Sequence, residues 1–231
     1  MALELDHAFV GCAPGAPEAR ALLERGLIEG TGNTHPGQGT ANRRFFFDNF
    51  MLELLWVADA RQVHSATTSP TRLAERCSRT HPATSPFGLV FRRAAEPGHE
   101  LAERRPFTTW TYRPAYLPAG MTIEIALGVP LQEPELIVLP FLPGAAHASR
   151  EPRSHGVAIG QIEKVSIGTP GHIPLSAAGR AAVRHGLVSY HQSTEPVMVL
   201  YCAPPFLGVL DLRPTLPLVF RGDKSSEPTD H

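Results

Sequence analysis

The chain has 231 residues, of which 42% are hydrophobic and 19% charged, a composition that excludes a disordered or fibrous protein. Its formal net charge of −1 provides no broad positive field, so neither nucleic acid nor a membrane is expected as a partner. Three scattered cysteines exclude a disulfide framework, and the acidic first residues, with no apolar run of about 18 residues anywhere, predict a cytoplasmic protein without a signal peptide.

The first block of the chain predicts the element order βαβββ. Residues 3–11 alternate in polarity, which indicates a strand, and residues 18–25 predict a short helix. A glycine-rich stretch over residues 30–39 predicts a weak strand or loop, and residues 43–48 and 50–57 predict a hairpin. One face of the first strand is expected to carry Leu3, Leu5, His7 and Phe9.

Later parts of the chain repeat this order in degraded form. The expected elements of a second block are strands over residues 87–93, 108–112, 122–129 and 135–142 and a helical piece over residues 99–105. Those of a third, partial βαββ copy are strands over residues 161–168, 196–202 and 207–212 and a helix over residues 176–185. Frequent prolines and glycines at the joins make long helices improbable.

These elements predict an α+β protein built from repeated small modules. The expected division is a first module over residues 1–60, a polar linker over 61–85, a second module over 86–143, a C-terminal partial module over 144–221 packed on the others, and a flexible tail over 222–231.

Three segments resemble the glyoxalase-like domain family of the vicinal oxygen chelate superfamily. They are Leu5-Asp6-His7-Ala8-Phe9-Val10, Thr34-His35-Pro36-Gly37-Gln38-Gly39-Thr40-Ala41-Asn42-Arg43 and Met51-Leu52-Glu53-Leu54-Leu55. The resemblance is close over residues 1–60, weak over 85–143, and fades beyond. It implies paired βαβββ modules that form a half-barrel, in which the first and fourth strands of each module are neighbours.

In such a half-barrel His7 and Glu53 occupy metal-ligating positions. A carboxylate in an apolar strand is costly without a cationic partner or a solvated cavity, which supports this assignment for Glu53. Imidazole and carboxylate together suit a divalent ion such as zinc, iron, manganese or nickel better than calcium. The alternative is an ion pair between Glu53 and Arg44 beside a hydrogen-bonded core His7.

The second module lacks the matching ligands. Apolar Leu89 and Val138 stand where the resemblance would place them. Because a stable catalytic site has about three protein ligands, an ion would need another donor. The candidates are Glu124, His155 and His172.

The stretch over residues 34–44 is rich in hydrogen-bonding groups and in glycines that let a backbone approach a ligand. Its candidate substrate-binding residues are His35, Thr40, Asn42 and Arg44. The alternative is a glycine turn before a hairpin, with Asn42 capping loop amides. No lysine-bearing phosphate loop is present, so no nucleotide site is expected.

Two functions from different classes follow from the resemblance. The first is a divalent-metal-dependent lyase, isomerase or dioxygenase that acts on a small oxygenated substrate. The second is a non-catalytic protein that sequesters a small molecule in the same cavity, which the incomplete ligand set favours. A scaffold that only forms a homodimer is a third possibility, for which the sequence gives no direct sign.

Overall fold

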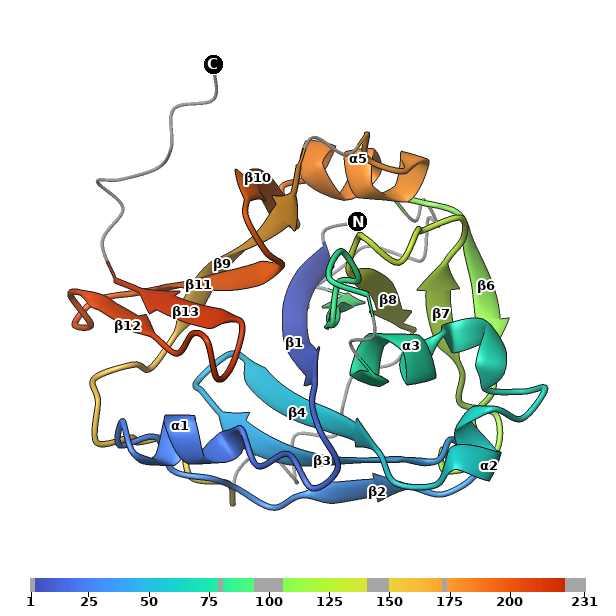
Figure 1. Cartoon of the computed structure of the whole chain (residues 1–231), viewed down its shortest axis with the longest axis horizontal. Coiled ribbons are helices and arrows are strands. Elements are labelled where there is room, and N and C mark those ends of the chain that lie inside the picture. Colours follow the sequence, from blue (N-terminus) through green and yellow to red (C-terminus); the bar gives the residue numbers. More distant parts are fainter. Residues whose placement is uncertain (1–2, 79–80, 94–105, 141–149, 172–173, 223–231) are drawn as a thin grey trace, which may run out of the picture.

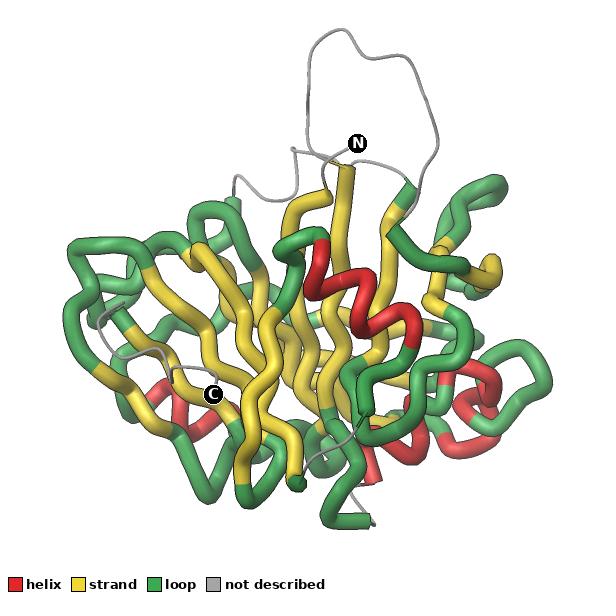
Figure 2. The backbone as a smooth tube through the Cα atoms, turned by 90° about the horizontal axis from the view of Figure 1, so that it is seen from above, coloured by secondary structure: helices red, strands yellow, loops and turns green. Residues whose placement is uncertain are grey.

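The structure is a computed structural model that describes residues 3–78, 81–93, 106–140, 150–171 and 174–222. It contains two mixed, open sheets with few and short helices, so the chain is an α+β protein as expected (Figures 1 and 2). None of the helices in these ranges is long and apolar enough to cross a membrane. The expected helix over residues 99–105 and the tail after Gly222 lie outside the described residues.

The larger sheet has eight strands in the order β2-β3-β4-β1-β5-β8-β7-β6. Their bounds are β1 Leu3–Gly11, β2 Asn33–His35, β3 Thr40–Phe46, β4 Met51–Val57, β5 Phe87–Arg93, β6 Thr109–Tyr112, β7 Ile123–Ala126 and β8 Glu135–Leu139. β1 pairs in parallel with β4, and β5 pairs in parallel with β8. The two halves therefore have the same strand order.

β1 and β5 pair antiparallel, which joins the two halves edge to edge. The paired modules were expected to form two sheets that face one another, and this expectation is wrong because a single curved sheet contains both (Figure 1). Most expected strands of this sheet are confirmed to within a few residues, because short runs rich in apolar residues and bounded by turn residues mark them.

An extra residue in β1 changes which face its side chains occupy. The pairing with β5 shifts register between Leu5 and His7, which leaves Asp6 as the bulged residue. Leu3 and Leu5 consequently pack against the core on one face, whereas His7 and Phe9 line a cavity on the other. The prediction that these four residues share a face is wrong.

Each face of the large sheet is buried in a separate apolar cluster. In β8, Leu136 and Val138 belong to the larger cluster, and Ile137 and Leu139 belong to the smaller one. We call the first face the outer face and the second the inner face. The small sheet covers the outer face, where the rings of Phe47 and Phe220 lie 5.8 Å apart.

The small sheet has five strands in the order β10-β9-β11-β13-β12, where a βαββ unit was expected. Its strands are β9 Ile162–Pro170, β10 Ser189–Ser193, β11 Val197–Cys202, β12 Val209–Asp211 and β13 Leu218–Arg221. Helix α5 (Ala177–Arg184) connects the parallel strands β9 and β10, and the Ser176 side chain caps its first turn by accepting from the Gly179 amide. β10 was missed because Tyr190 is its only hydrophobic residue.

The segment expected as a polar linker is folded and packed. It contains α2 (Ala60–Val63), a 3₁₀ turn η1 (Ser69–Thr71) and α3 (Leu73–Ser78), while α1 (Ala19–Leu23) precedes β2. α3 packs against β1 and β4 on the inner side of the curved sheet (Figure 1). The inner face is thus partly covered, and a cavity lies between this cover and the strands.

Candidate functional site

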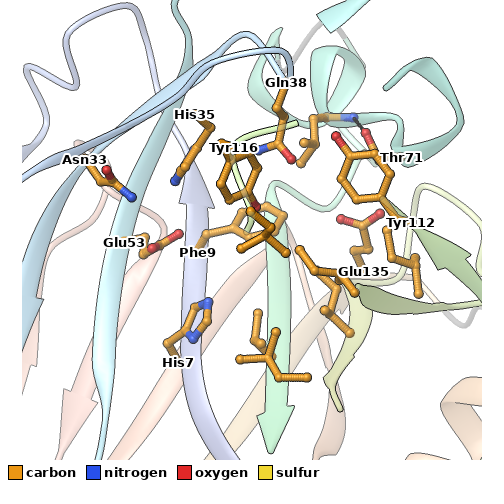
Figure 3. Close-up of a pocket in the computed structure, with 17 residues that line it drawn as sticks. His7, Phe9, Asn33, His35, Gln38, Glu53, Thr71, Tyr112, Tyr116 and Glu135 are labelled. Atoms are coloured by element: carbon orange, nitrogen blue, oxygen red, sulfur yellow. Dashed lines mark hydrogen bonds between the residues drawn. The ribbon is translucent and has the colours of Figure 1, made fainter. Parts of the chain in front are cut away.

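A cavity of ≈ 210 Å³ lies on the inner face of the large sheet (Figure 3). Apolar side chains from β1, β5, β7 and β8 form much of its wall. The polar residues near β1–β4 are His7, Asn33, His35, Gln38, Glu53 and Tyr116, and those on the side of α3, β6 and β8 are Thr71, Tyr112 and Glu135. A largely apolar cavity with a few converging polar groups is typical of a small-molecule site.

His7 is held by a carboxylate that the β-bulge places next to it. Its Nδ1 lies 2.6 Å from an oxygen of Asp6, whose other oxygen accepts from Arg92 at 3.0 Å. Arg92 in turn donates to Glu4 at 2.7 Å. This chain of contacts orients the imidazole and leaves its Nε2 as the atom available to the cavity.

The same contacts set the protonation behaviour of His7. Burial alone would lower its pKa, but the hydrogen bond to Asp6 and the charges of Glu53 and Asp6 together raise it. Burial would raise the pKa of Asp6, yet the contacts with His7 and Arg92 lower it. His7 and Asp6 therefore act as one coupled pair.

Asp6→Asn is expected to lower the pKa of His7, because the substitution removes the contact that outweighs burial. Because the pKa of His7 is higher in the folded protein than in the unfolded chain, where it is roughly 6.5, protonation of His7 stabilises the fold at low pH. This stabilisation is lost as the pH rises through the pKa of His7 in the folded protein. The variant should therefore lose more stability at pH 5.5 than at pH 9. NMR titration of the imidazoles tests this, with His155 on the outer face as internal control; an unchanged His7 titration would contradict it.

Glu53 projects from β4 into the same cavity and is held by an amide. Its Oε1 accepts from the Asn42 side chain at 2.8 Å, and the Asn42 oxygen accepts from the Asn33 backbone amide at 2.8 Å. Glu53 pairs with Phe9 in the register of β4 and β1, so His7 lies two residues from its partner on the same face. Both predicted ligands thus come together at one cavity.

The alternative ion pair between Glu53 and Arg44 is not formed, although the two residues stand opposite each other in the ladder. Arg44 donates instead to the Thr31 carbonyl oxygen at 2.6 Å and stacks over the Phe46 ring, 5.2 Å from its centroid. Arg44 does not line the cavity among the described residues. Its expected role in substrate binding is therefore not supported by its position.

The glycine-rich turn places His35 on the cavity wall. The imidazole Nδ1 lies 2.9 Å from the Thr40 hydroxyl, which accepts from Gln38 at 2.7 Å. The His35 ring packs against the Tyr116 ring at a tilt of 41°, with the centroids 4.7 Å apart. Burial lowers the pKa of His35, so the ring favours its neutral form. Thr40 and Asn42 lie behind the wall and position His35 and Glu53 respectively.

Gly39 makes this turn possible. Its φ is +81°, and a Cβ at this position would stand 2.4 Å from the Asp59 carbonyl oxygen. The close approach fixes the turn against the start of α2.

The additional ligand candidates lie elsewhere. Glu124 is on the opposite face of its strand, where it accepts from Thr109 at 2.8 Å and Thr111 at 2.9 Å. His155 accepts from the Ile28 amide at 3.0 Å on the outer side of the sheet, and neither residue lines the cavity. His172 lies outside the described residues.

The predicted second-module positions also face away from the cavity. Leu89 and Val138 are buried in the outer-face cluster, because the inner face of β5 and β8 is presented by Val90 and Ile137. The inner-face positions of β5 and β8 are therefore one residue away from Leu89 and Val138 along each strand.

Sequence reasoning missed Glu135, which begins β8. Its side chain lines the cavity although the residue is only 5% exposed. Burial raises its pKa to about 7, against the opposing effect of the Arg76 charge. The available signal was a glutamate opening the run Glu-Leu-Ile-Val-Leu, where a solvated strand edge is the simpler interpretation.

The fit to a metal ion is incomplete. His7 Nε2 and the Glu53 carboxylate offer two donors, and the described part of the chain contains no group of three or more His, Cys, Asp or Glu side chains arranged to hold an ion. Since stable sites have about three or four protein ligands, these two residues alone would hold an ion weakly.

Comparison with known proteins identifies a shared fold. No family model matches the chain, and no curated protein matches it. A solved structure matches the chain in its fold. The crystal structure of a hypothetical protein from Staphylococcus aureus superposes with a TM-score of 0.50 at 10% sequence identity, covering 95% of this chain and 99% of that one. At this identity the likeness concerns the fold alone, and it extends over both sheets.

Proposed function

We propose that this chain is a glyoxalase-like protein of the vicinal oxygen chelate superfamily whose inner cavity binds a small oxygenated molecule. The observation that carries the proposal is that His7 and Glu53, from the neighbouring parallel strands β1 and β4, line one cavity. The equal strand order of the two halves, with β1 beside β4 and β5 beside β8, supports paired modules of that superfamily.

Binding of a small molecule is the function that this geometry supports best. An apolar cavity of roughly 150 Å³ accommodates benzene, so ≈ 210 Å³ suits one six-membered ring with short substituents. The wall combines apolar surface with a histidine pair and two carboxyl groups, which would orient such a ligand. Sequestration requires no more than this.

A metal-dependent lyase, isomerase or dioxygenase is the second candidate. It is favoured by the Asp6 contact, because ligating histidines commonly donate their other ring nitrogen to a carboxylate. His7 and Glu53 would hold zinc, iron, manganese or nickel, and the ion would polarise adjacent oxygens of the substrate. His35 and Tyr116 would then confine the substrate beside these two residues.

Calorimetric titration of zinc, manganese and iron separates these candidates. Because only two donors are present, we expect no tight binding to the wild-type protein and the same isotherms for Glu53→Gln. Glu124→Gln is a matched control, since Glu124 is a buried carboxylate on the opposite face. Tight binding by the wild type and Glu124→Gln that Glu53→Gln abolishes would contradict this expectation, establish a metal site at Glu53 and favour the metal-dependent enzyme. If small-molecule probes also fail to bind, the cavity has neither function.

A further inference from the structure

Glu135 differs from the other buried glutamates of the described chain in having no donor. Glu124 accepts from two threonine hydroxyls, and Glu133 accepts from the backbone amide and the hydroxyl of Ser176. No hydrogen bond or ion pair reaches the Glu135 side chain within the described ranges, although the residue is 95% buried. The residue lines the cavity, so its carboxyl oxygens face that space and a hydrogen-bond donor for them would have to lie inside the cavity.

The cation whose charge acts on Glu135 does not supply this donor. Arg76 is 2% exposed and influences Glu135 through its charge. Its Nη1, however, donates to the backbone carbonyl oxygens of Ser85 at 2.9 Å and Glu133 at 2.8 Å. Arg76 does not line the cavity, and the Glu135 carboxyl group is left facing the empty volume beside Tyr112 and Thr71 (Figure 3).

The charge of the cavity wall is one-sided. It carries the carboxyl groups of Glu53 and Glu135, whereas no lysine or arginine is among the described residues that line it. Protonated His7 would add a positive charge, but Asp6 lies 2.6 Å away and balances it. His35 is buried and favours its neutral form, since burial lowers its pKa. An anionic ligand would therefore find no fixed cation in this cavity.

We propose that the ligand of this cavity is a small organic amine, with an apolar body of about one ring and a protonated nitrogen that donates to Glu135. This inference rests on the proposed small-molecule function and names the class of ligand. The ammonium group supplies the donors that Glu135 lacks and replaces its lost hydration. Tyr112 and Tyr116 present aromatic rings that also attract a cation.

The two ends of the cavity would then recognise different parts of the ligand. The nitrogen lies at the Glu135 end, and the apolar ring packs against Phe9 and Ile137 in the middle. An oxygen substituent would reach the opposite end, where Asn33 and His35 offer hydrogen-bonding groups. Carboxylates and phosphates are repelled by Glu53 and, at the pH of 8 used below, by ionised Glu135.

Three probes with the same ring test the proposal: benzylamine, benzyl alcohol and benzoate, titrated by calorimetry at pH 8. We expect benzylamine to bind at least tenfold more tightly than benzoate, with benzyl alcohol between them. Glu135→Gln should weaken benzylamine binding by about tenfold and change benzyl alcohol binding by less than twofold. Glu124→Gln should leave all three affinities unchanged, because that residue lies on the opposite face of the strand.

Each other outcome overturns a defined part of the argument. Equal affinities, or tightest binding of benzoate, would refute the amine while leaving the cavity a small-molecule site. Preference for benzylamine that survives in Glu135→Gln would refute the role of Glu135. Failure of all three probes to bind the folded wild-type protein would refute the proposed function together with this inference. Thermal denaturation of each variant verifies that it is folded.

Discussion

Glu135→Gln is expected to stabilise the folded protein by about 3 kcal/mol at pH 8 and by less than about 1 kcal/mol at pH 5. The unfolded chain releases this proton near the ordinary pKa of 4.5, whereas the folded protein keeps it until about 7, because burial disfavours the carboxylate. The native state therefore binds more protons between these values, and stability falls as the pH rises through them. Each pKa unit corresponds to about 1.4 kcal/mol.

Urea denaturation of wild type and variant at both pH values measures this difference. Glutamine preserves the volume of the side chain and cannot ionise, so the comparison isolates the charge. Glu124→Gln is the matched control: its carboxylate has two hydroxyl donors, so its loss should destabilise the protein at pH 8. A destabilised Glu135→Gln at pH 8 would mean that the carboxylate has a protein donor after all.

The strands of the large sheet were predictable because short apolar runs bounded by turn residues mark them. Phe87–Arg93 was expected as a strand and is β5 with the same bounds. Its residues pack alternately, with Leu89 on the outer face and Val90 on the inner face. An apolar run that is buried on both faces indicates a strand but does not say which face meets a cavity, and the wrong face was expected for Leu89.

The pairing of Asp6 with His7 could not be deduced from the first strand by itself. Adjacent side chains of a regular strand point to opposite faces. The bulge that brings these two together depends on the register between β1 and β5, which lie about eighty residues apart in the chain. The sequence motif predicted His7 as a site residue, but its contact with Asp6 depends on the tertiary pairing.

Glu135 was missed for a related physical reason. A glutamate at the start of an apolar strand is normally solvated, and only the sheet order shows that β8 is an interior strand with β5 and β7 on its two sides. The cover of the inner face was missed as well, since Thr71 and Leu73 lie in a segment whose prolines and polar residues indicated a linker.

Glu133→Gln is expected to destabilise the protein by about 2 kcal/mol at pH 8. Glu135→Gln, two residues later, is expected to stabilise it. Glu133 is 1% exposed and accepts from the Ser176 amide at 2.5 Å and from its hydroxyl at 2.8 Å. Ser176 is the N-cap of α5, so the carboxylate also faces the positive end of that helix. Glutamine keeps one acceptor and loses the charge.

The close packing around Glu133 leaves little room for the glutamine side chain to find other hydrogen-bond partners. A Cβ on Gly179 would stand 2.2 Å from the Glu133 Oε2, so the first turn of α5 is closed around the carboxylate. Urea denaturation measures the change, and Glu75→Gln on the exposed surface of α3 is the control, expected within about 0.5 kcal/mol of wild type. An equally small effect of Glu133→Gln would show that the contacts of Glu133 with Ser176 do not contribute to the stability of the fold. The two substitutions are therefore expected to change stability in opposite directions, because Glu133 has hydrogen-bond donors within the protein and Glu135 is proposed to receive its donor from a ligand.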